Sequence, residues 1–332
     1  LVSSIWLSKT MLKKQNILNL SNKPTAALIL ENGLVFWGYG VGAKKYAIGE
    51  LCFNTSQTGY QEILTDPSYA KQIINFTFPH VGIVGTNYLD NESSKIHACG
   101  CVLNQSLVKR SNWRSEKDLD FFFTKNNIAC ITNIDTRQIT RILASKGAMK
   151  SAIINFGNNQ NNIKRIKNEI NKWKGLNNLD LTKIVSTNKN YSWSEGRWSL
   201  KNNSYKIKLE KNLYKIVCLD FGIKRNILRN LCSKNFDVIV MNSKSSFEDI
   251  ISLNPDGIFL SNGPGDPYAT SAYAVPTIKK LIKKKMPIFG ICLGHQLLGL
   301  ALGAKTEKMF QGHRGANHPV INLKTKKVEI TS

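Results

Sequence analysis

The spacing of apolar residues divides the chain into two regions of different character. Between residues 23 and 53, short apolar runs such as 26–30 and 34–37 alternate with glycines, which predicts short antiparallel strands joined by tight turns. Between residues 214 and 304, continuous apolar runs alternate with segments of helical spacing. That alternation is typical of a doubly wound parallel sheet. We therefore predict an α/β protein with a mixed β/α N-terminal domain and a parallel-sheet C-terminal domain.

The chain has 332 residues, enough for two domains with separate cores. Residues 1–22 form an N-terminal extension with no clear assignment, and residues 23–174 form the predicted N-terminal domain. The pattern breaks into polar and aromatic pieces over residues 175–213, which we interpret as a connecting segment. Residues 214–332 form the predicted C-terminal domain, which we expect to be incomplete at its C-terminus.

Further elements are expected in the N-terminal domain and in the connecting segment. Asp135 fits the N-cap of a helix, and Gly147 fits its C-terminal end. The connecting segment contains an expected pair of strands around Trp193 and Trp198. The other predicted elements are strands over 73–78 and 128–131, a helix over 118–126, and a helix with Ile163, Ile166, Ile170 and Trp173 on one face.

In the C-terminal domain, predicted strands and helices alternate regularly, and this alternation predicts where a ligand site lies. Ligands of open parallel sheets bind beyond the carboxyl ends of the strands, so the residues that follow each strand are the candidates. The predicted strands cover 215–220, 237–241, 257–260 and 287–291, and the predicted helices cover 224–232, 246–253, 274–284 and 297–304.

Residues 290–296, Gly-Ile-Cys-Leu-Gly-His-Gln, join a predicted strand to a predicted helix and have the layout of a nucleophile elbow. The glycines allow a tight turn, and the helix N-terminus favours a thiolate at Cys292. Its amide groups can also hold an oxyanion. The alternative is a buried structural cysteine beside a glycine turn. The two flanking glycines and the His-Gln pair favour catalysis.

Residues 261–267, Ser-Asn-Gly-Pro-Gly-Asp-Pro, follow the preceding strand. They could form only a turn, but their position one βα unit before the elbow favours one wall of its pocket. Gly263 and Gly265 offer amides without a side chain in the way. In the N-terminal domain, Ser56 lies in a loop and could be a helix cap or a ligand contact, of which a cap is commoner.

Composition and motifs weigh against several other classes of function, of which nucleic-acid binding stays as a weaker third hypothesis. The formal net charge of +24 suggests nucleic-acid binding, but the lysines are spread along the chain among Asn and Ile, and no nucleic-acid-reading module appears. No apolar run is long enough to cross a membrane, and we expect no signal peptide. The seven cysteines form no C-x-x-C pair, which favours reduced thiols in a cytoplasmic protein without a metal site. No G-x-x-x-x-G-K-[ST] loop for ATP is present.

Together, residues 263–267 and 290–296 resemble the class I, or triad, glutamine amidotransferases. Within that class, residues 54–62, 134–137 and 312–319 resemble the small subunit of carbamoyl-phosphate synthetase. The resemblance runs from about residue 23 to the end of the chain, with both domains in family order. The two amidotransferase motifs alone are also compatible with another class I amidotransferase. The N-terminal segments make the resemblance specific to the small subunit.

The resemblance implies a glutamine-hydrolysing subunit in which Cys292 is the nucleophile. It implies that the amides of Gly263 and Leu293 form the oxyanion hole, and that Ser56, Gly265 and Gln296 also contact the substrate glutamine. Ammonia would pass to a large subunit that makes carbamoyl phosphate from bicarbonate and ATP, for arginine and pyrimidine synthesis. No cofactor is implied for this chain, and ATP and Mg²⁺ are expected on the large subunit.

The sequence departs from the family at the general base. A thiol nucleophile needs a base to take its proton and return it to the leaving ammonia. The family supplies a histidine and an acid from a Gly-His-Pro-Glu-like motif, which we expect beyond Ser332. None of His295, His313 and His318 matches that motif. The competing hypothesis is a scaffold that binds the large subunit without hydrolysing glutamine.

Overall fold

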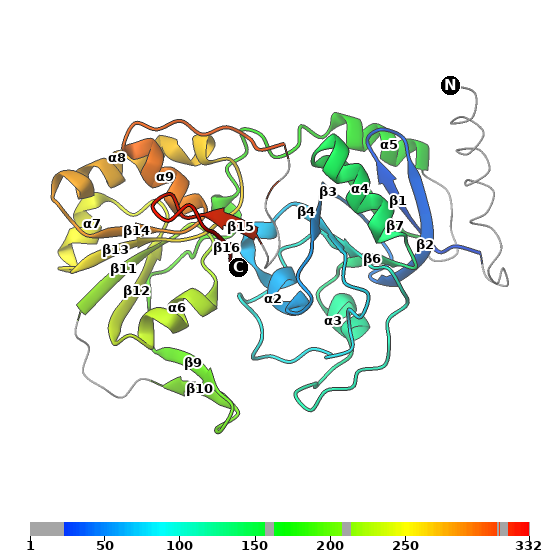
Figure 1. The fold of residues 1–332 in the computed structure, drawn as a ribbon, viewed down its shortest axis with the longest axis horizontal. Helices are drawn as coiled ribbons and strands as arrows, with labels where there is room; N and C mark the ends of the chain where they lie inside the picture. Colours follow the sequence, from blue (N-terminus) through cyan, green and yellow to red (C-terminus); the bar gives the residue numbers. More distant parts are fainter. Residues whose placement is uncertain (1–22, 157–162, 208–213, 311, 313–317, 332) are drawn as a thin grey trace.

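The computed structural model describes residues 23–156, 163–207, 214–310, 312 and 318–331. In Figure 1 these residues form two lobes side by side, an N-terminal lobe coloured blue to green and a C-terminal lobe coloured yellow to red. Both lobes combine helices with sheets, which confirms the predicted fold class. No helix among the described residues is long and apolar enough to span a membrane.

Seven strands of the N-terminal lobe close into a barrel in the order β1-β2-β6-β5-β4-β3-β7, and β7 pairs back with β1. β1 and β2 are antiparallel, as predicted. The pattern predicts neither β5 nor β7, because β5 is too short to show a period and Lys150 and Ser151 interrupt the apolar run of β7. The strands are β1 Ala26–Leu30, β2 Val35–Gly42, β3 Tyr46–Asn54, β4 Gln72–Phe76, β5 Gly100–Val102, β6 Ala129–Thr132 and β7 Met149–Asn155.

The predicted helices of this lobe are present, and their ends have the expected chemistry. The side chain of Asp135 caps α4 by accepting a hydrogen bond from the backbone N of Gln138 at 2.8 Å. Gly147 ends the helix with φ 83°, a conformation that favours glycine. The lobe also contains α2, which the pattern does not predict. The helices are α2 Tyr60–Thr65, the 3₁₀ turn η1 Pro67–Tyr69, α3 Leu119–Lys125, α4 Thr136–Lys146 and α5 Ile163–Lys172.

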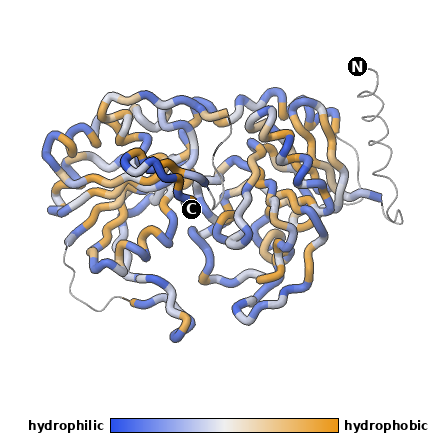
Figure 2. Tube along the Cα trace, in the orientation of Figure 1, coloured by the Kyte–Doolittle hydropathy of each residue, from blue (hydrophilic) through white to orange (hydrophobic). Residues whose placement is uncertain are grey.

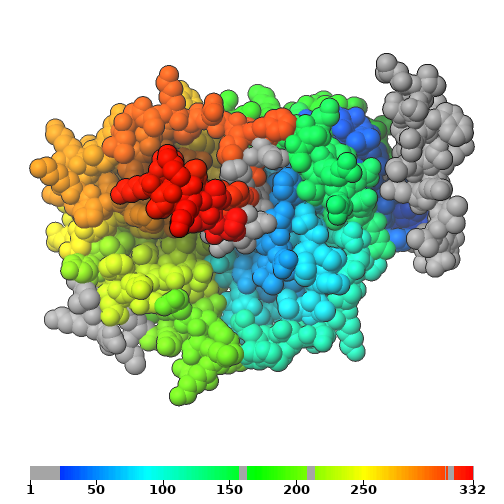
Figure 3. Space-filling model, viewed as in Figure 1, coloured from blue at the N-terminus to red at the C-terminus, as the bar shows by residue number. Residues whose placement is uncertain are grey.

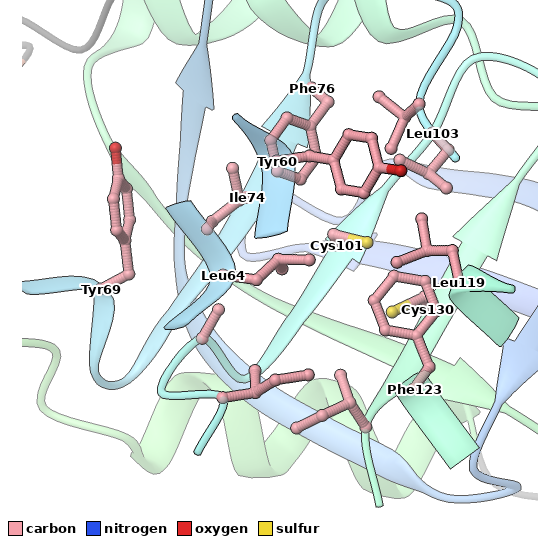
Figure 4. Close-up of a cluster of buried hydrophobic side chains, with 14 of the residues drawn as sticks. Tyr60, Leu64, Tyr69, Ile74, Phe76, Cys101, Leu103, Leu119, Phe123 and Cys130 are labelled. Atoms are coloured by element: carbon pink, nitrogen blue, oxygen red, sulfur yellow. The ribbon is translucent and has the colours of Figure 1, made fainter. Parts of the chain in front are cut away.

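One buried cluster packs α2 and α3 against the barrel (Figure 4). Tyr60 and Leu64 of α2 and Phe123 of α3 lie in it together with Cys101 and Cys130 of adjacent strands. Both cysteines are fully buried, and burial raises the pKa of the Cys101 thiol well above its usual value. A buried thiol of this kind is a core residue rather than a nucleophile.

The connecting segment differs from its prediction in one respect. Strands do form at Trp193 and Trp198, but they do not pair with each other. β8, Tyr191–Trp193, adds antiparallel to β12 at the edge of the C-terminal sheet, whereas β9, Glu195–Ser199, pairs with β10, Ser204–Ile207. The partner of β8 lies far along the chain, so local pattern cannot reveal it. The boundaries of the connecting segment remain predictions.

The C-terminal lobe is built on a five-stranded sheet in the order β14-β13-β11-β12-β8. β11 to β14 are parallel, as predicted, and apolar residues, in orange, recur along the strands of this lobe in Figure 2. The strands are β11 Tyr214–Asp220, β12 Phe236–Asn242, β13 Gly257–Leu260 and β14 Ile288–Gly290. The helices are α6 Arg225–Cys232, α7 Phe247–Ser252, α8 Pro267–Lys283 and α9 Leu293–Ala301.

Two features at the end of the chain differ from expectation. Helix α8 begins at Pro267 rather than near Ala274, because Asp266 caps it and a proline fits the first helical position. Strands β15, His318–Ile321, and β16, Val328–Thr331, form an additional antiparallel hairpin. In Figure 3 this hairpin, in red, covers part of the C-terminal lobe on the side next to the N-terminal lobe.

Candidate active site

Cys292 stands at a sharp turn between strand β14 and helix α9. Its backbone has φ 52° and ψ −114°, a conformation that residues other than glycine rarely adopt. It is the N-cap of α9, and it is exposed, whereas the other six cysteines are buried or half-buried. This is the strand–turn–helix geometry that a nucleophile elbow requires, as predicted.

The two glycines of the elbow are required by close packing. A Cβ on Gly290 would lie 2.7 Å from the carbonyl carbon of Gly294, and a Cβ on Gly294 would lie 2.2 Å from the carbonyl oxygen of Leu260. The amide of Gly294 also donates a hydrogen bond to Ser261 O at 3.0 Å. The first turn of α9 therefore lies directly against the end of β13.

The loop after β13 forms a second wall beside the elbow. The backbone N of Phe221 donates a hydrogen bond to Ser261 Oγ at 2.9 Å, which fixes the start of the loop. A Cβ on Gly263 would lie 2.1 Å from Phe221 O and 3.0 Å from Leu293 Cδ2. Gly263 and Leu293, the two residues of the expected oxyanion hole, are therefore neighbours.

The connecting segment supports the far end of this loop. Gly265 has φ 96°, and a Cβ on it would lie 2.6 Å from Leu179 O. Asp266 follows, and its backbone N donates to Leu179 O at 3.0 Å while its Oδ2 accepts from Asn178 N at 2.8 Å. The turn is thus held by backbone hydrogen bonds and has no room for a larger residue at Gly265.

A cavity of about 670 Å³ lies between the two lobes, and Cys292 is among its lining residues. Gly263, Gly265 and Gln296 also line it, together with residues of the barrel strand β3. Such a volume is within the usual range of small-molecule sites. The site is therefore built by both lobes, with the thiol supplied by the C-terminal one.

Charged residues that sequence reasoning missed line the same cavity. Lys224 Nζ lies 3.8 Å from Asp66 Oδ2 across the two lobes, and Lys308 Nζ lies 2.8 Å from Glu50 Oε2. Asp66 belongs to an Asp-Pro-Ser sequence at the start of the 3₁₀ turn η1. No sequence signal marks Asp66 as part of the site, since its proximity to Lys224 depends on the fold.

The family model described as "Carbamoyl-phosphate synthase small chain, CPSase domain" matches residues 28–153. The model described as "Glutamine amidotransferase class-I" matches residues 217–332. The first model covers the barrel lobe, and the second contains the elbow and the loop after β13.

Curated relatives match almost the whole chain. A carbamoyl phosphate synthase small chain from Zymomonas mobilis is 48% identical over 92% of this chain and 81% of its own length. The small chain from Bartonella bacilliformis is 50% identical over 93% of this chain and 78% of its own length. The small chain of Escherichia coli K12 is 48% identical over 93% of this chain and 80% of its own length. The chain belongs to the carbamoyl-phosphate synthase small-chain family.

Within this small-chain family member, the predicted site residues take two kinds of position. Cys292, Gly263, Gly265 and Gln296 line the cavity. Leu293 is buried behind the elbow and is not among the lining residues, so the role of its backbone amide in an oxyanion hole stays a prediction. Ser56 is half-buried after strand β3 and is not among the lining residues, and its backbone N donates to Asn54 Oδ1 at 2.8 Å. A contact between Ser56 and glutamine therefore stays a prediction.

No histidine is among the described residues that line the cavity. His295 is exposed in the first turn of α9, and His318 lies in strand β15. His313 lies outside the described residues. In the described part of this small chain, no cluster of His, Cys, Asp and Glu could hold a metal ion.

Proposed function

We propose that the chain is the glutamine-hydrolysing small subunit of carbamoyl-phosphate synthase, with Cys292 as the nucleophile. The observation that supports this best is an exposed thiol on a strained elbow that lines a cavity between the lobes. Gly263 and Leu293 are neighbours, which supports the proposal that their backbone amides hold the oxyanion. A thiol nucleophile and hydrogen-bond donors for the oxyanion are the parts that acyl transfer from an amide requires.

In the proposed reaction, Cys292 Sγ attacks the side-chain carbonyl carbon of glutamine, and the carbonyl oxygen becomes an oxyanion held by the amides of Gly263 and Leu293. The C–N bond then breaks, ammonia leaves with an added proton, and a glutamyl thioester remains. Water attacks the thioester, which releases glutamate and restores the thiol. The resemblance assigns the proton transfers to a histidine of a Gly-His-Pro-Glu-like motif, which His295, His313 and His318 do not match.

The proposed partner is a large subunit that takes the ammonia and makes carbamoyl phosphate from bicarbonate and ATP. ATP and Mg²⁺ are proposed to bind there, as the family resemblance implies. The product would serve arginine and pyrimidine synthesis. A cytoplasmic location is supported by seven cysteines without a disulfide.

The test is carbamoyl phosphate synthesis by the full natural chain assembled with the large subunit, with glutamine or an ammonium salt as nitrogen source. We expect Cys292→Ser to lower the glutamine-dependent rate at least about 1,000-fold, because a hydroxyl replaces the nucleophilic thiol. The ammonia-dependent rate should be unchanged. Cys99→Ser, at a half-buried cysteine whose thiol pKa is raised by burial, is the control and should keep both rates.

The second candidate is a scaffold that supports the large subunit without hydrolysing glutamine. It predicts an unmutated complex that uses ammonium salts but not glutamine. A glutamine-dependent rate that Cys292→Ser leaves intact would instead reject Cys292 as the nucleophile. Another class I amidotransferase is disfavoured because the small-chain family model matches residues 28–153.

A further inference from the structure

Asn262 joins three segments of the chain through its side chain. Its Nδ2 donates hydrogen bonds to Ser68 Oγ and to Gly222 O, both at 2.9 Å, and lies 3.4 Å from Asp66 Oδ1. Its Oδ1 accepts a hydrogen bond from the backbone N of Lys224 at 3.2 Å. The residue is only 4% exposed, so these bonds satisfy the amide where water cannot replace them.

The partners in the N-terminal lobe are themselves held rigidly. Asp66 caps the 3₁₀ turn η1, and its Oδ1 accepts a hydrogen bond from the backbone N of Ser68 at 2.8 Å. Its Oδ2 lies 3.8 Å from Lys224 Nζ of the other lobe. The side chain of Asn262 is therefore anchored on a turn with little freedom of its own.

Close packing at Phe221 and Gly222 connects the anchored side chain of Asn262 to the loop that carries Gly263. Gly222 has φ 128°, and a Cβ on it would lie 3.0 Å from Pro264 Cδ and 3.1 Å from Pro67 Cβ. A Cβ on Gly263 would lie 2.1 Å from Phe221 O. The turn at residues 221–222 is thus packed between the N-terminal lobe on one side and the loop after β13 on the other.

We propose that Asn262 is a positioning residue for the oxyanion hole, and that the turn at residues 66–68 of the N-terminal lobe sets its place. Asn262 directly precedes Gly263, so a shift of its side chain moves the amide that would face the oxyanion. This inference rests on the proposed glutaminase activity. It gives the N-terminal lobe a part in catalysis that does not require contact with glutamine.

The size of the effect follows from the demands of an oxyanion hole. Removing one such donor costs about 100- to 1,000-fold in kcat, and a misplacement of about 1 Å can cost about 100-fold. Asn262 would act through the amide of Gly263, which meets a full negative charge only when the oxyanion forms. Loss of the anchor should therefore lower kcat more than it changes KM.

The test measures glutamine hydrolysis by the full chain in its complex with the large subunit. Asn262→Asp keeps the shape but replaces the donating amide by a carboxylate beside Asp66 and Gly222 O. We expect kcat to fall about 100-fold with KM changed less than about threefold. Ser68→Ala removes one anchoring bond and should lower kcat about fivefold to tenfold, whereas Ser68→Thr keeps the hydroxyl and should restore it.

Two further readouts separate positioning from a loss of structure. The rate at which iodoacetamide alkylates Cys292 and the ammonia-dependent synthesis rate should both match the unmutated complex. Ser93→Ala is the matched control, since Ser93 Oγ donates to Thr65 O and to Lys95 O within the N-terminal lobe. It should leave kcat unchanged.

The proposal is overturned if Asn262→Asp and Ser68→Ala keep kcat within about twofold while the unmutated complex hydrolyses glutamine. It is also overturned if Ser68→Ala lowers kcat only in proportion to lost alkylation and lost ammonia-dependent synthesis, because that marks a general loss of structure. An unmutated complex without glutamine hydrolysis would instead reject the proposed function, and this inference with it.

Discussion

At the scale of single residues, conformation and burial separate reactive groups from structural ones. Cys292 is held at φ 52°, which costs a non-glycine residue about 1 kcal/mol or more. Close contacts of Gly290 and Gly294 on either side hold it there. Cys101 and Cys130, by contrast, are fully buried between strands and helices. Local sequence could predict this difference, because the elbow motif is contiguous.

Glu62 gives the molecule a predicted pH dependence. Burial raises its pKa to about 7, nearby Asp90 and Glu92 add to the effect, and Arg114 opposes it. Because the pKa of the folded state lies above that of the unfolded chain, native stability is lost as pH rises from about 4.5 to about 7.

We therefore expect Glu62→Gln to exceed the original protein in unfolding free energy at pH 8, by up to about 3 kcal/mol, and to match it at pH 4. Urea denaturation at both pH values measures the difference. The same difference in unfolding free energy at pH 4 and pH 8 would show that the charge of Glu62 is not its source.

At the scale of elements, helix α9 contains two glycines with opposite roles. A Cβ on Gly294 would lie 2.2 Å from Leu260 O, because the first turn of α9 packs against the end of β13. A Cβ on Gly299 would meet nothing nearer than Ala304 Cβ at 3.8 Å. The first glycine is required by packing, whereas the second only weakens the helix.

Gly294→Ala should lower the free energy of unfolding by about 2–4 kcal/mol, since either the backbone of α9 or that of β13 must move. Gly299→Ala, the matched variant in the same helix, should raise it by about 0.5–1 kcal/mol. Urea denaturation of both variants checks the pair. Equal effects of the two alanines would contradict the close approach at Gly294.

Other elements show which structural features the sequence predicts and which it does not. Asp135 and Gly147 mark the ends of α4 by local chemistry, so the helix could be predicted closely. β8 could not be assigned to its sheet, because its partner β12 is too far along the chain for the local pattern of apolar residues to reveal the pairing. The sequence pattern places Pro267 in a loop, whereas in the structure it opens α8.

At the scale of the whole molecule, contacts between the lobes complete features that neither lobe makes alone. The N-cap of α6, Lys224, has no side-chain acceptor, and Glu92 of the N-terminal lobe takes its place. Glu92 O accepts from Arg225 N at 2.9 Å, and Glu92 Oε2 accepts from Asn226 N at 2.8 Å. The first turn of a helix in one lobe is thus capped by the other.

Glu92→Ala should lower the free energy of unfolding by about 1–2 kcal/mol, because the backbone N–H of Asn226 loses its acceptor in the first turn of α6. Glu92→Gln keeps an oxygen acceptor and should cost less. Thermal unfolding of the two variants measures the order. If alanine and glutamine were equally destabilising, the cap would not be the source of the effect.

The packing of the two lobes explains which parts of the candidate site could be predicted from the sequence. Cys292, Gly263 and Gly265 each follow a strand in a contiguous motif, so their place at one edge of the sheet follows from the sequence. Asp66 and Glu50 reach the cavity only because the barrel lies against the sheet. Contacts of this kind depend on the packing of distant segments, which neither periodicity nor motif spacing encodes.

The closed barrel of the N-terminal lobe has a consequence for self-association. Each of its seven strands has a neighbour on both sides, so the barrel has no edge strand along which a second chain could pair over its full length. Fibril-like growth by strand addition is therefore blocked in this lobe for as long as the barrel stays closed.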